Sequence, residues 1–134
     1  MKKLLAFLAC ALVGASAAVA GEYEDISISD LKKEIEKGKV IIIDVNGSQS
    51  YAKGHIPGAI DYASKKGELE ELLKDKDKDT LVVAYCGGPS CSAYKSGAKA
   101  AEKLKFKNIK HLSAGISGWL QAGEKTEKAE KKDS

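Results

Sequence analysis

Two cysteines lie five residues apart in a loop that directly follows an apolar segment, Cys86-Gly87-Gly88-Pro89-Ser90-Cys91. The two glycines let backbone amides turn inward, and converging amides form a cradle that binds anions. Such a cradle stabilises a thiolate, lowering a cysteine pKa from ~8.5 into the range ~3.5 to 7.5. It also accepts an oxyanion substrate beside the sulfur. We therefore expect Cys86 to be a nucleophile, against the alternative of a buried structural cysteine.

The substrate anion is expected to lie against this loop. Every basic side chain in the sequence is lysine and none is arginine, so no bidentate guanidinium can hold an anion. A phosphatase is excluded for the same reason. Lys95 is the auxiliary cation that the sequence offers near the loop. The loop residues expected to surround the anion are Gly87, Gly88, Pro89, Ser90 and Ser92.

Cys91 allows two interpretations. It is a candidate resolving or redox partner of Cys86, since the loop between them is short and contains two glycines. A disulfide requires that the two Cα atoms approach within ~7 Å, which a curled loop achieves. The alternative is that Cys91 is only a small apolar residue.

Other polar residues give weaker signals. Asp44 is expected either to orient the active edge of the sheet through hydrogen bonds or to cap local backbone amides. His55, in a turn, favours a structural role over that of a general base, and His111 has less support still as a catalytic residue. Trp119 is expected in the core. Two cysteines and two scattered histidines lack the spacing of a zinc site, so no metal is expected.

Two strongly apolar runs predict the strands that position these residues. Residues 39–45 and 80–85 are continuous runs typical of strands buried on both faces of a parallel sheet. Strands alternate with helices along the chain, which predicts an α/β fold with helices on both faces. Ligands bind beyond the carboxyl ends of such strands, where Asp44 and Cys86 both lie.

The remaining elements follow from weaker patterns. Residues 26–28 are expected to form a strand, and Ser29 to cap a helix that Gly38 ends. A third strand of moderate clarity is expected at 108–113. Further helices are predicted at 48–53, at 68–73, from Ser92 or Ala93 to Leu104, and at 115–122.

The chain divides into three parts. Residues 1–20 have a basic start and an apolar run that ends in Ala18-Val19-Ala20, which predicts a secretory signal peptide cleaved before Gly21 and a periplasmic or secreted protein. Lipidation at Cys10 is the alternative, although residues 7–9 fit such a site poorly. Residues 21–122 are expected to form one domain, and residues 123–134 a charged, disordered tail. Without Lys2 and Lys3, 20 lysines face 19 acidic residues, so neither a nucleic-acid nor a membrane footprint is present.

Three segments in series resemble the rhodanese-like family. They are Asp44-Val45 with the turn Gly54-His55-Ile56-Pro57-Gly58-Ala59, the strand and loop at Cys86, and Gly115-Ile116-Ser117-Gly118-Trp119. The resemblance implies a single domain with a five-stranded, mainly parallel sheet. It also implies that Cys86 takes sulfane sulfur from a donor such as thiosulfate and passes it to a thiophilic acceptor. Exported rhodanese-like proteins with a Cys-x-x-Pro-x-Cys loop are the subgroup it is most similar to.

The departures from that family concern charge. Asn46 and Ser50 stand where an arginine and an acidic residue are usual, and Cys91 stands where the loop usually has arginine. Anion binding must therefore depend on backbone amides. The predicted function is a sulfurtransferase or persulfide carrier with a small-molecule sulfur donor, a thiol acceptor and no cofactor. The alternatives are a thiol-disulfide switch that uses Cys86 and Cys91, and a non-catalytic binding module.

Overall fold

The computed structural model describes residues 23–129. The predicted signal peptide, its cleavage before Gly21 and the lipidation alternative at Cys10 lie outside the described residues, as do residues 130–134. Among residues 23–129, no helix has the length and apolar character needed to cross a membrane.

Five parallel strands form a single sheet in the order β1-β5-β4-β2-β3, which confirms the expected architecture. The apolar runs became β2 and β4, and every residue of β2 is buried because helices cover both of its faces. The strands are β1 (Glu24–Asp25), β2 (Ile41–Asp44), β3 (Ile60–Asp61), β4 (Leu81–Tyr85) and β5 (Asn108–His111).

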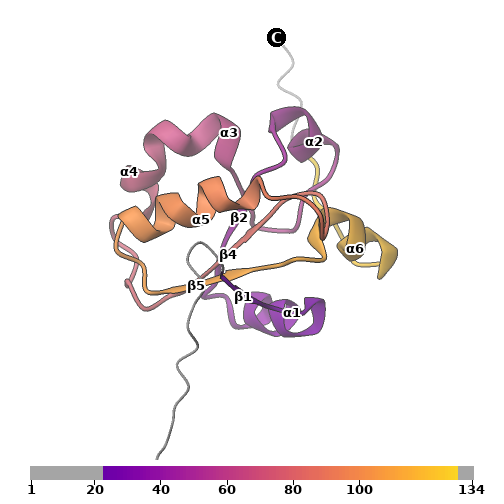
Figure 1. The fold of residues 1–134 in the computed structure, drawn as a ribbon, viewed down its shortest axis with the longest axis horizontal. Helices are drawn as coiled ribbons and strands as arrows, with labels where there is room; N and C mark the ends of the chain where they lie inside the picture. The colour runs from indigo at the N-terminus through magenta and orange to yellow at the C-terminus, as the bar shows by residue number, and fades with distance from the viewer. Residues whose placement is uncertain (1–22, 130–134) are drawn as a thin grey trace, which may run out of the picture.

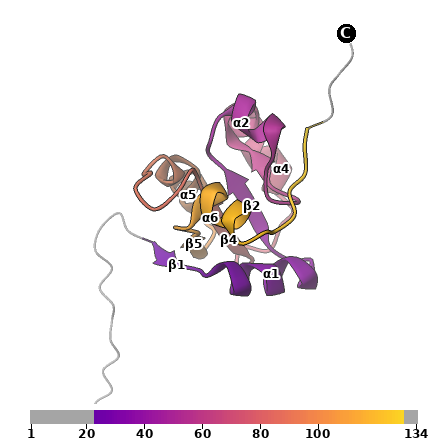
Figure 2. The ribbon, with the colours of Figure 1, turned by 90° about the vertical axis from the view of Figure 1, so that its right-hand side faces the viewer.

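Helices lie on both faces of this sheet, as Figures 1 and 2 show. One face is covered by α1 (Ile28–Lys37) and α6 (Gly115–Gln121), which contribute Leu31 and Trp119 to its core. The other is covered by α5 (Tyr94–Lys103) and α4 (Leu69–Leu73). The shorter elements are α2 (Ser48–Lys53), α3 (Tyr62–Lys65) and the 3-10 helix η1 (Lys66–Glu68).

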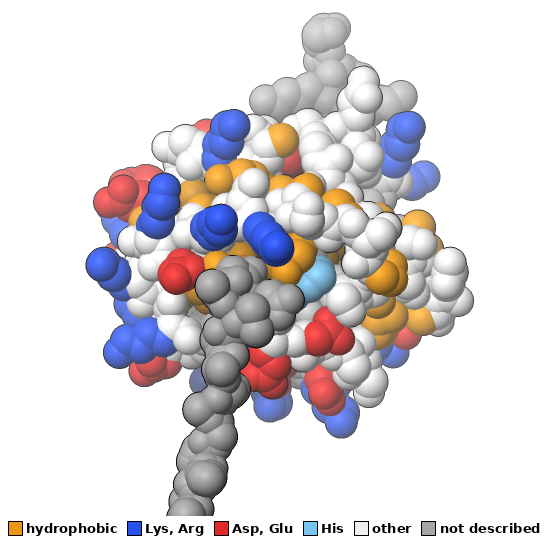
Figure 3. All heavy atoms as spheres, in the orientation of Figure 1, with side chains coloured by type: hydrophobic (Ala, Val, Ile, Leu, Met, Phe, Trp, Pro, Cys, Tyr) orange, Lys and Arg blue, Asp and Glu red, His pale blue; other side chains and the backbone are white. Residues whose placement is uncertain are grey.

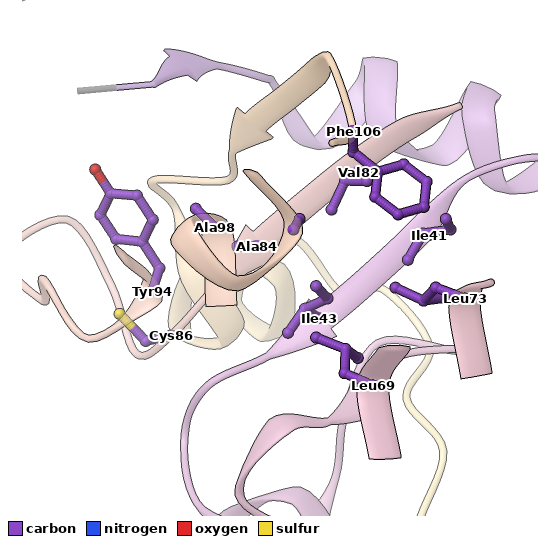
Figure 4. Close-up of a cluster of buried hydrophobic side chains, with 11 residues drawn as sticks. Ile41, Ile43, Leu69, Leu73, Val82, Ala84, Cys86, Tyr94, Ala98 and Phe106 are labelled. Atoms are coloured by element: carbon purple, nitrogen blue, oxygen red, sulfur yellow. The ribbon is translucent and has the colours of Figure 1, made fainter. Parts of the chain in front are cut away.

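Successive side chains of β4 alternate between these two cores. Val83 and Tyr85 pack on the α1 side, while Val82 and Ala84 pack on the α5 side. Cys86 continues the alternation and joins the α5-side core, where Figure 4 shows it at one end of the cluster near Tyr94. The strand therefore delivers Cys86 to the carboxyl edge of the sheet with its side chain on the α5 side.

The beginning of the described chain differs from the expectation. The strand is Glu24–Asp25, which pairs with β5, and residues 26–28 do not form one. Ser27, and not Ser29, caps α1, since its hydroxyl accepts a hydrogen bond from the amide of Asp30 at 3.0 Å. Ile26 is buried in the core directly before this cap, so the spacing of two isoleucines reflects a helix entry and not a strand.

Residues 123–129 also differ from the expected disordered tail. His55 and Glu127 exchange two backbone hydrogen bonds of 2.9 Å, and Nε1 of Trp119 donates to the carbonyl oxygen of Lys125 at 2.7 Å. The ordered domain therefore extends past residue 122. The segment has no large apolar residue, and its contacts are made by the backbone, which composition does not reveal.

Candidate functional site

Cys86 lies at the floor of the loop that follows β4, the central strand of the sheet. Its residue surface is 2% exposed, and it belongs to the same buried cluster as Ala84, Tyr94 and Ala98. Cys91 is only partly buried and packs against the edge of that cluster. The loop therefore has a buried cysteine at its floor and an accessible one at its rim.

A disulfide joins Cys86 to Cys91. The two Cα atoms are 6.3 Å apart, within the limit of about 7 Å for a bridge that needs no movement of the backbone. The amide of Cys91 also donates to the carbonyl oxygen of Gly88 at 3.0 Å, which closes the loop on itself. The geometric condition that we placed on pairing these cysteines is thus met.

The first turn of α6 holds the backbone of the cysteine loop. The amide of Ile116 donates to the carbonyl oxygen of Cys86, and the amide of Ser117 to that of Gly87, both at 3.0 Å. In a trans peptide the N–H points away from the preceding C=O, so the amides of Gly87 and Gly88 face away from α6. Neither amide has an acceptor among residues 23–129. Two adjacent free amides are the donor arrangement from which an anion cradle is built.

Gly115 makes this contact between α6 and the loop possible. A Cβ at this position would lie 2.6 Å from the carbonyl group of Gly87 and from the amide nitrogen of Gly88. Its φ is +63°, in the left-handed region that favours glycine. Gly115 is part of the family resemblance, yet no role at the site was predicted for it from its residue type or spacing. The signal that could have indicated this role is a glycine at the start of a short helix that closely follows a strand.

Asp44 lies fully buried at the end of β2 and accepts two hydrogen bonds. One comes from the hydroxyl of Tyr85 at 2.6 Å and the other from the amide of Asn46 at 2.8 Å. The tyrosine hydroxyl in turn accepts from the amide of Ile56 at 3.0 Å. Asp44 therefore performs both of the roles that the sequence left open, capping a local amide and orienting the sheet edge.

Burial is the largest influence on the pKa values of Asp44 and Tyr85. Desolvation raises the pKa of Asp44, although the hydrogen bonds from Tyr85 and Asn46 act in the opposite direction. Burial, together with the nearby Asp44 charge, raises the pKa of Tyr85 above its ordinary value. Tyr85 directly precedes Cys86 and was not among the expected site residues. A tyrosine that ends an otherwise aliphatic strand was the signal for it.

Lys95 lies in the first turn of α5 and is half-buried. Lys99 and Lys103 follow it along α5 at four-residue intervals. Figure 3 shows basic side chains scattered over the face of the molecule that is seen in Figure 1. Burial is the main cause that lowers the pKa of His111, and the positive charge of Lys95 acts in the same direction. The structure thus places Lys95 one short segment beyond the cysteine loop. The exposed loop residues Pro89, Ser90 and Ser92 form the rim around Cys91.

The two histidines each stack on a tyrosine. The ring centroids of His55 and Tyr51 are 3.6 Å apart, and Nδ1 of His55 lies 2.8 Å from the carbonyl oxygen of Tyr51. These contacts support a structural role for His55. His111 stacks on Tyr94 at 3.4 Å, and its Nε2 has no hydrogen-bond partner within the described residues. Burial is the main cause that lowers the pKa of His111.

Metal binding finds no support in residues 23–129, where no three histidine, cysteine or acidic side chains converge as ligands. The candidate site therefore consists of the cysteine pair, the loop amides and the elements behind them. It can form and break bonds to sulfur.

The comparisons with known proteins agree with this architecture. A family model described as "Rhodanese-like domain" matches residues 27–122. Among solved structures, the BH2092 protein from Bacillus halodurans is 31% identical with a TM-score of 0.61, and the match covers 79% of this chain and 77% of that one. A thiosulfate sulfurtransferase from Pseudomonas aeruginosa is 25% identical with a TM-score of 0.66, covering 81% of this chain and 20% of that one.

Two curated relatives have different printed descriptions. The "HTH-type transcriptional regulator Rv0324" of Mycobacterium tuberculosis is 36% identical over 112 residues, which is 81% of this chain. This chain spans only 47% of that regulator's length. The "Uncharacterized protein YibN" of Escherichia coli K12 is 29% identical over 123 residues, covering 90% of this chain and 82% of the relative.

Proposed function

Because this chain belongs to the rhodanese-like domain family, we propose that it carries sulfane sulfur on Cys86 as a persulfide and passes it to a thiol acceptor. The observation that carries the proposal is the position of Cys86 at the end of the central strand, in a loop whose carbonyl groups are bound to α6. The similar protein from Pseudomonas aeruginosa, described as a thiosulfate sulfurtransferase, supports the choice of donor.

The loading step starts from the reduced protein. The Cys86 thiolate attacks the outer sulfur of thiosulfate, so that a bond forms between Sγ and that sulfur. The S–S bond of thiosulfate breaks, and its electron pair leaves with sulfite. The free amides of Gly87 and Gly88 are the donors we assign to the anionic oxygens of the donor. In the next step, an acceptor thiolate takes the outer sulfur and Cys86 departs as a thiolate.

The disulfide favours a second reaction at the same site. The Cys91 thiolate attacks Sγ of persulfidated Cys86, expels the outer sulfur as hydrosulfide and leaves the Cys86–Cys91 disulfide. The Cα distance of 6.3 Å supports this closure. A thiol reductant is then required before another sulfur atom can be loaded. The redox-switch alternative and the carrier function are thus two states of one site.

Intact mass spectrometry tests the proposal. Fully reduced protein exposed to thiosulfate should gain the mass of one sulfur atom, and Cys86→Ala should lose this gain because it lacks the nucleophile. Cys91→Ala should keep the sulfur and retain it longer, because no thiol closes on the persulfide. A gain that survives in Cys86→Ala, or is lost only in Cys91→Ala, would overturn the assignment.

A further inference from the structure

The two sulfur atoms of the Cys86–Cys91 bridge differ in accessibility. Cys86 is 2% exposed and lies in the α5-side core, whereas Cys91 is partly exposed on the loop rim. The residues on either side of Cys91, Ser90 and Ser92, are exposed and have small side chains. A reagent from solvent therefore meets Cys91 first.

The stereochemistry of thiol exchange strengthens this difference. A thiolate attacks one sulfur in line with the S–S bond, from the side opposite the sulfur that leaves. Attack on Cys86 requires an approach to a sulfur that is packed among Ala84, Tyr94 and Ala98. Attack on Cys91 requires an approach from the rim. Because Cys91 is the more exposed of the two residues, the second approach is the favoured one in the folded protein.

Attack at Cys91 makes Cys86 the leaving group. Cys86 then departs as a thiolate in the loop that holds the amides of Gly87 and Gly88, which have no acceptor among residues 23–129. These amides are hydrogen-bond donors available to the departing thiolate.

We infer that a dithiol reductant opens the bridge by attacking Sγ of Cys91, and that this class of partner docks on the loop rim. A bond forms between the reductant sulfur and Cys91, the Cys86–Cys91 bond breaks, and Cys86 takes the electron pair. The second thiol of the reductant then attacks the reductant sulfur of the mixed disulfide. Cys91 leaves as a thiolate, and the reductant becomes a disulfide after giving two electrons.

A reductant with one thiol is insufficient for a geometric reason. After the first exchange, the Cys86 thiolate lies beside the mixed disulfide, since the two Cα atoms are 6.3 Å apart. It attacks Cys91 again at high effective concentration and expels the monothiol. A dithiol escapes this reversal because its own second thiol is equally close. The inference deepens the proposed function by naming its resetting partner, and it rests on that function only for the use of Cys86 as the sulfur carrier.

Mapping the mixed disulfide tests the inference. Oxidised protein is exposed briefly to glutathione, quenched with acid, alkylated with N-ethylmaleimide and fragmented by tandem mass spectrometry. Glutathione should lie on Cys91 and maleimide on Cys86, in about tenfold excess over the reverse pattern, because Cys91 is the more exposed of the two cysteines. The control is the same oxidised protein unfolded in urea, where the ratio should approach one. Glutathione on Cys86 in the folded protein, at or above the level on Cys91, would contradict the inference.

A second arm compares two probes at equal thiol concentration. Dithiothreitol should reduce the bridge completely, while 2-mercaptoethanol should leave most protein oxidised with a small mixed-disulfide population. Equal extents of reduction would refute the requirement for a dithiol. Thiosulfate loading of reduced protein is measured separately, so a protein that never gains sulfur yet shows the expected mapping would refute the proposed function alone.

Discussion

The hydroxyl of Tyr85 donates a 2.6 Å hydrogen bond to Oδ2 of Asp44, and both side chains are fully buried. The bond joins the ends of two neighbouring strands, and Tyr85 directly precedes Cys86. The amide of Ile56 donates to the same hydroxyl at 3.0 Å, which attaches the turn after α2. The position of Cys86 is therefore fixed from the α1 side of the sheet, opposite its own side chain.

Removing this hydroxyl should destabilise the protein. In Tyr85→Phe the carboxylate of Asp44 loses a donor and the amide of Ile56 loses its acceptor, both at a buried site. We expect the free energy of unfolding to fall by about 1–3 kcal/mol, measured by urea denaturation. Tyr23→Phe is the control, since that hydroxyl bonds Glu102 at an exposed position and should change stability less. Equal losses in the two variants would contradict the role of the buried network.

Gly115→Ala should disturb the cysteine loop, because the new Cβ would meet the peptide between Gly87 and Gly88 at 2.6 Å. Gly123→Ala is a matched control: it also has a positive φ, 75° against 63°, but nothing lies within 4 Å of its Cβ position. Both variants incur the backbone strain, and only the first incurs the collision. We expect Gly115→Ala to lose about 1–3 kcal/mol more stability than the control.

The same pair of variants tests the site. Gly115→Ala should also load sulfur from thiosulfate more slowly than Gly123→Ala, because α6 then no longer holds the loop carbonyls in place. Mass spectrometry over time gives the two rates. If the variants are equally stable and load sulfur equally fast, the contact between Gly115 and the loop has no role in positioning Cys86.

His111 should make the protein less stable in mild acid. Burial lowers its pKa below the ordinary value of 6.5, and Lys95 acts in the same direction while Asp25 opposes both. The unfolded chain therefore binds a proton at a pH where the folded protein does not. This contribution to stability is complete above about pH 6.5 and is lost as the pH falls toward the folded pKa.

His111→Phe isolates that contribution, since a phenyl ring keeps the stack on Tyr94 and cannot be protonated. Urea unfolding is measured for both proteins between about pH 7.5 and pH 5. The difference in unfolding free energy should shift in favour of the variant as the pH falls. A difference that stays constant over this range would rule out a pH-dependent role for His111.

Truncation after residue 122 should destabilise the domain, because it removes the two backbone bonds to His55 and the acceptor of Trp119 Nε1. We expect a loss of about 2–4 kcal/mol in urea unfolding followed by tryptophan fluorescence. Truncation after residue 129 is the control and should leave the unfolding midpoint unchanged. Equal stability of the two truncated proteins would mean that residues 123–129 contribute nothing to the fold.

The sheet was predicted well where a local pattern was strong. The apolar runs around Ile43 and Val83 became β2 and β4, and the rule that parallel strands end at one edge placed Asp44 and Cys86 there. The strand expected at residues 26–28 and the disorder expected at residues 123–129 were predicted incorrectly. The strand was inferred from the spacing of two isoleucines, and the disorder from the lack of large apolar residues. Both segments are instead held by hydrogen bonds to distant parts of the chain, which a local pattern does not show.

The sequence by itself determined the α/β class, the two central strands and the placement of Cys86 at their shared edge. These depend on side-chain periodicity and strand direction, which are properties of neighbouring residues. Only the tertiary structure decided that Cys86 is buried while Cys91 is accessible, that α6 binds the loop, and that Tyr85 bonds Asp44. Each of these depends on the packing of elements on the sheet, and a one-dimensional pattern does not specify which donor then meets which acceptor.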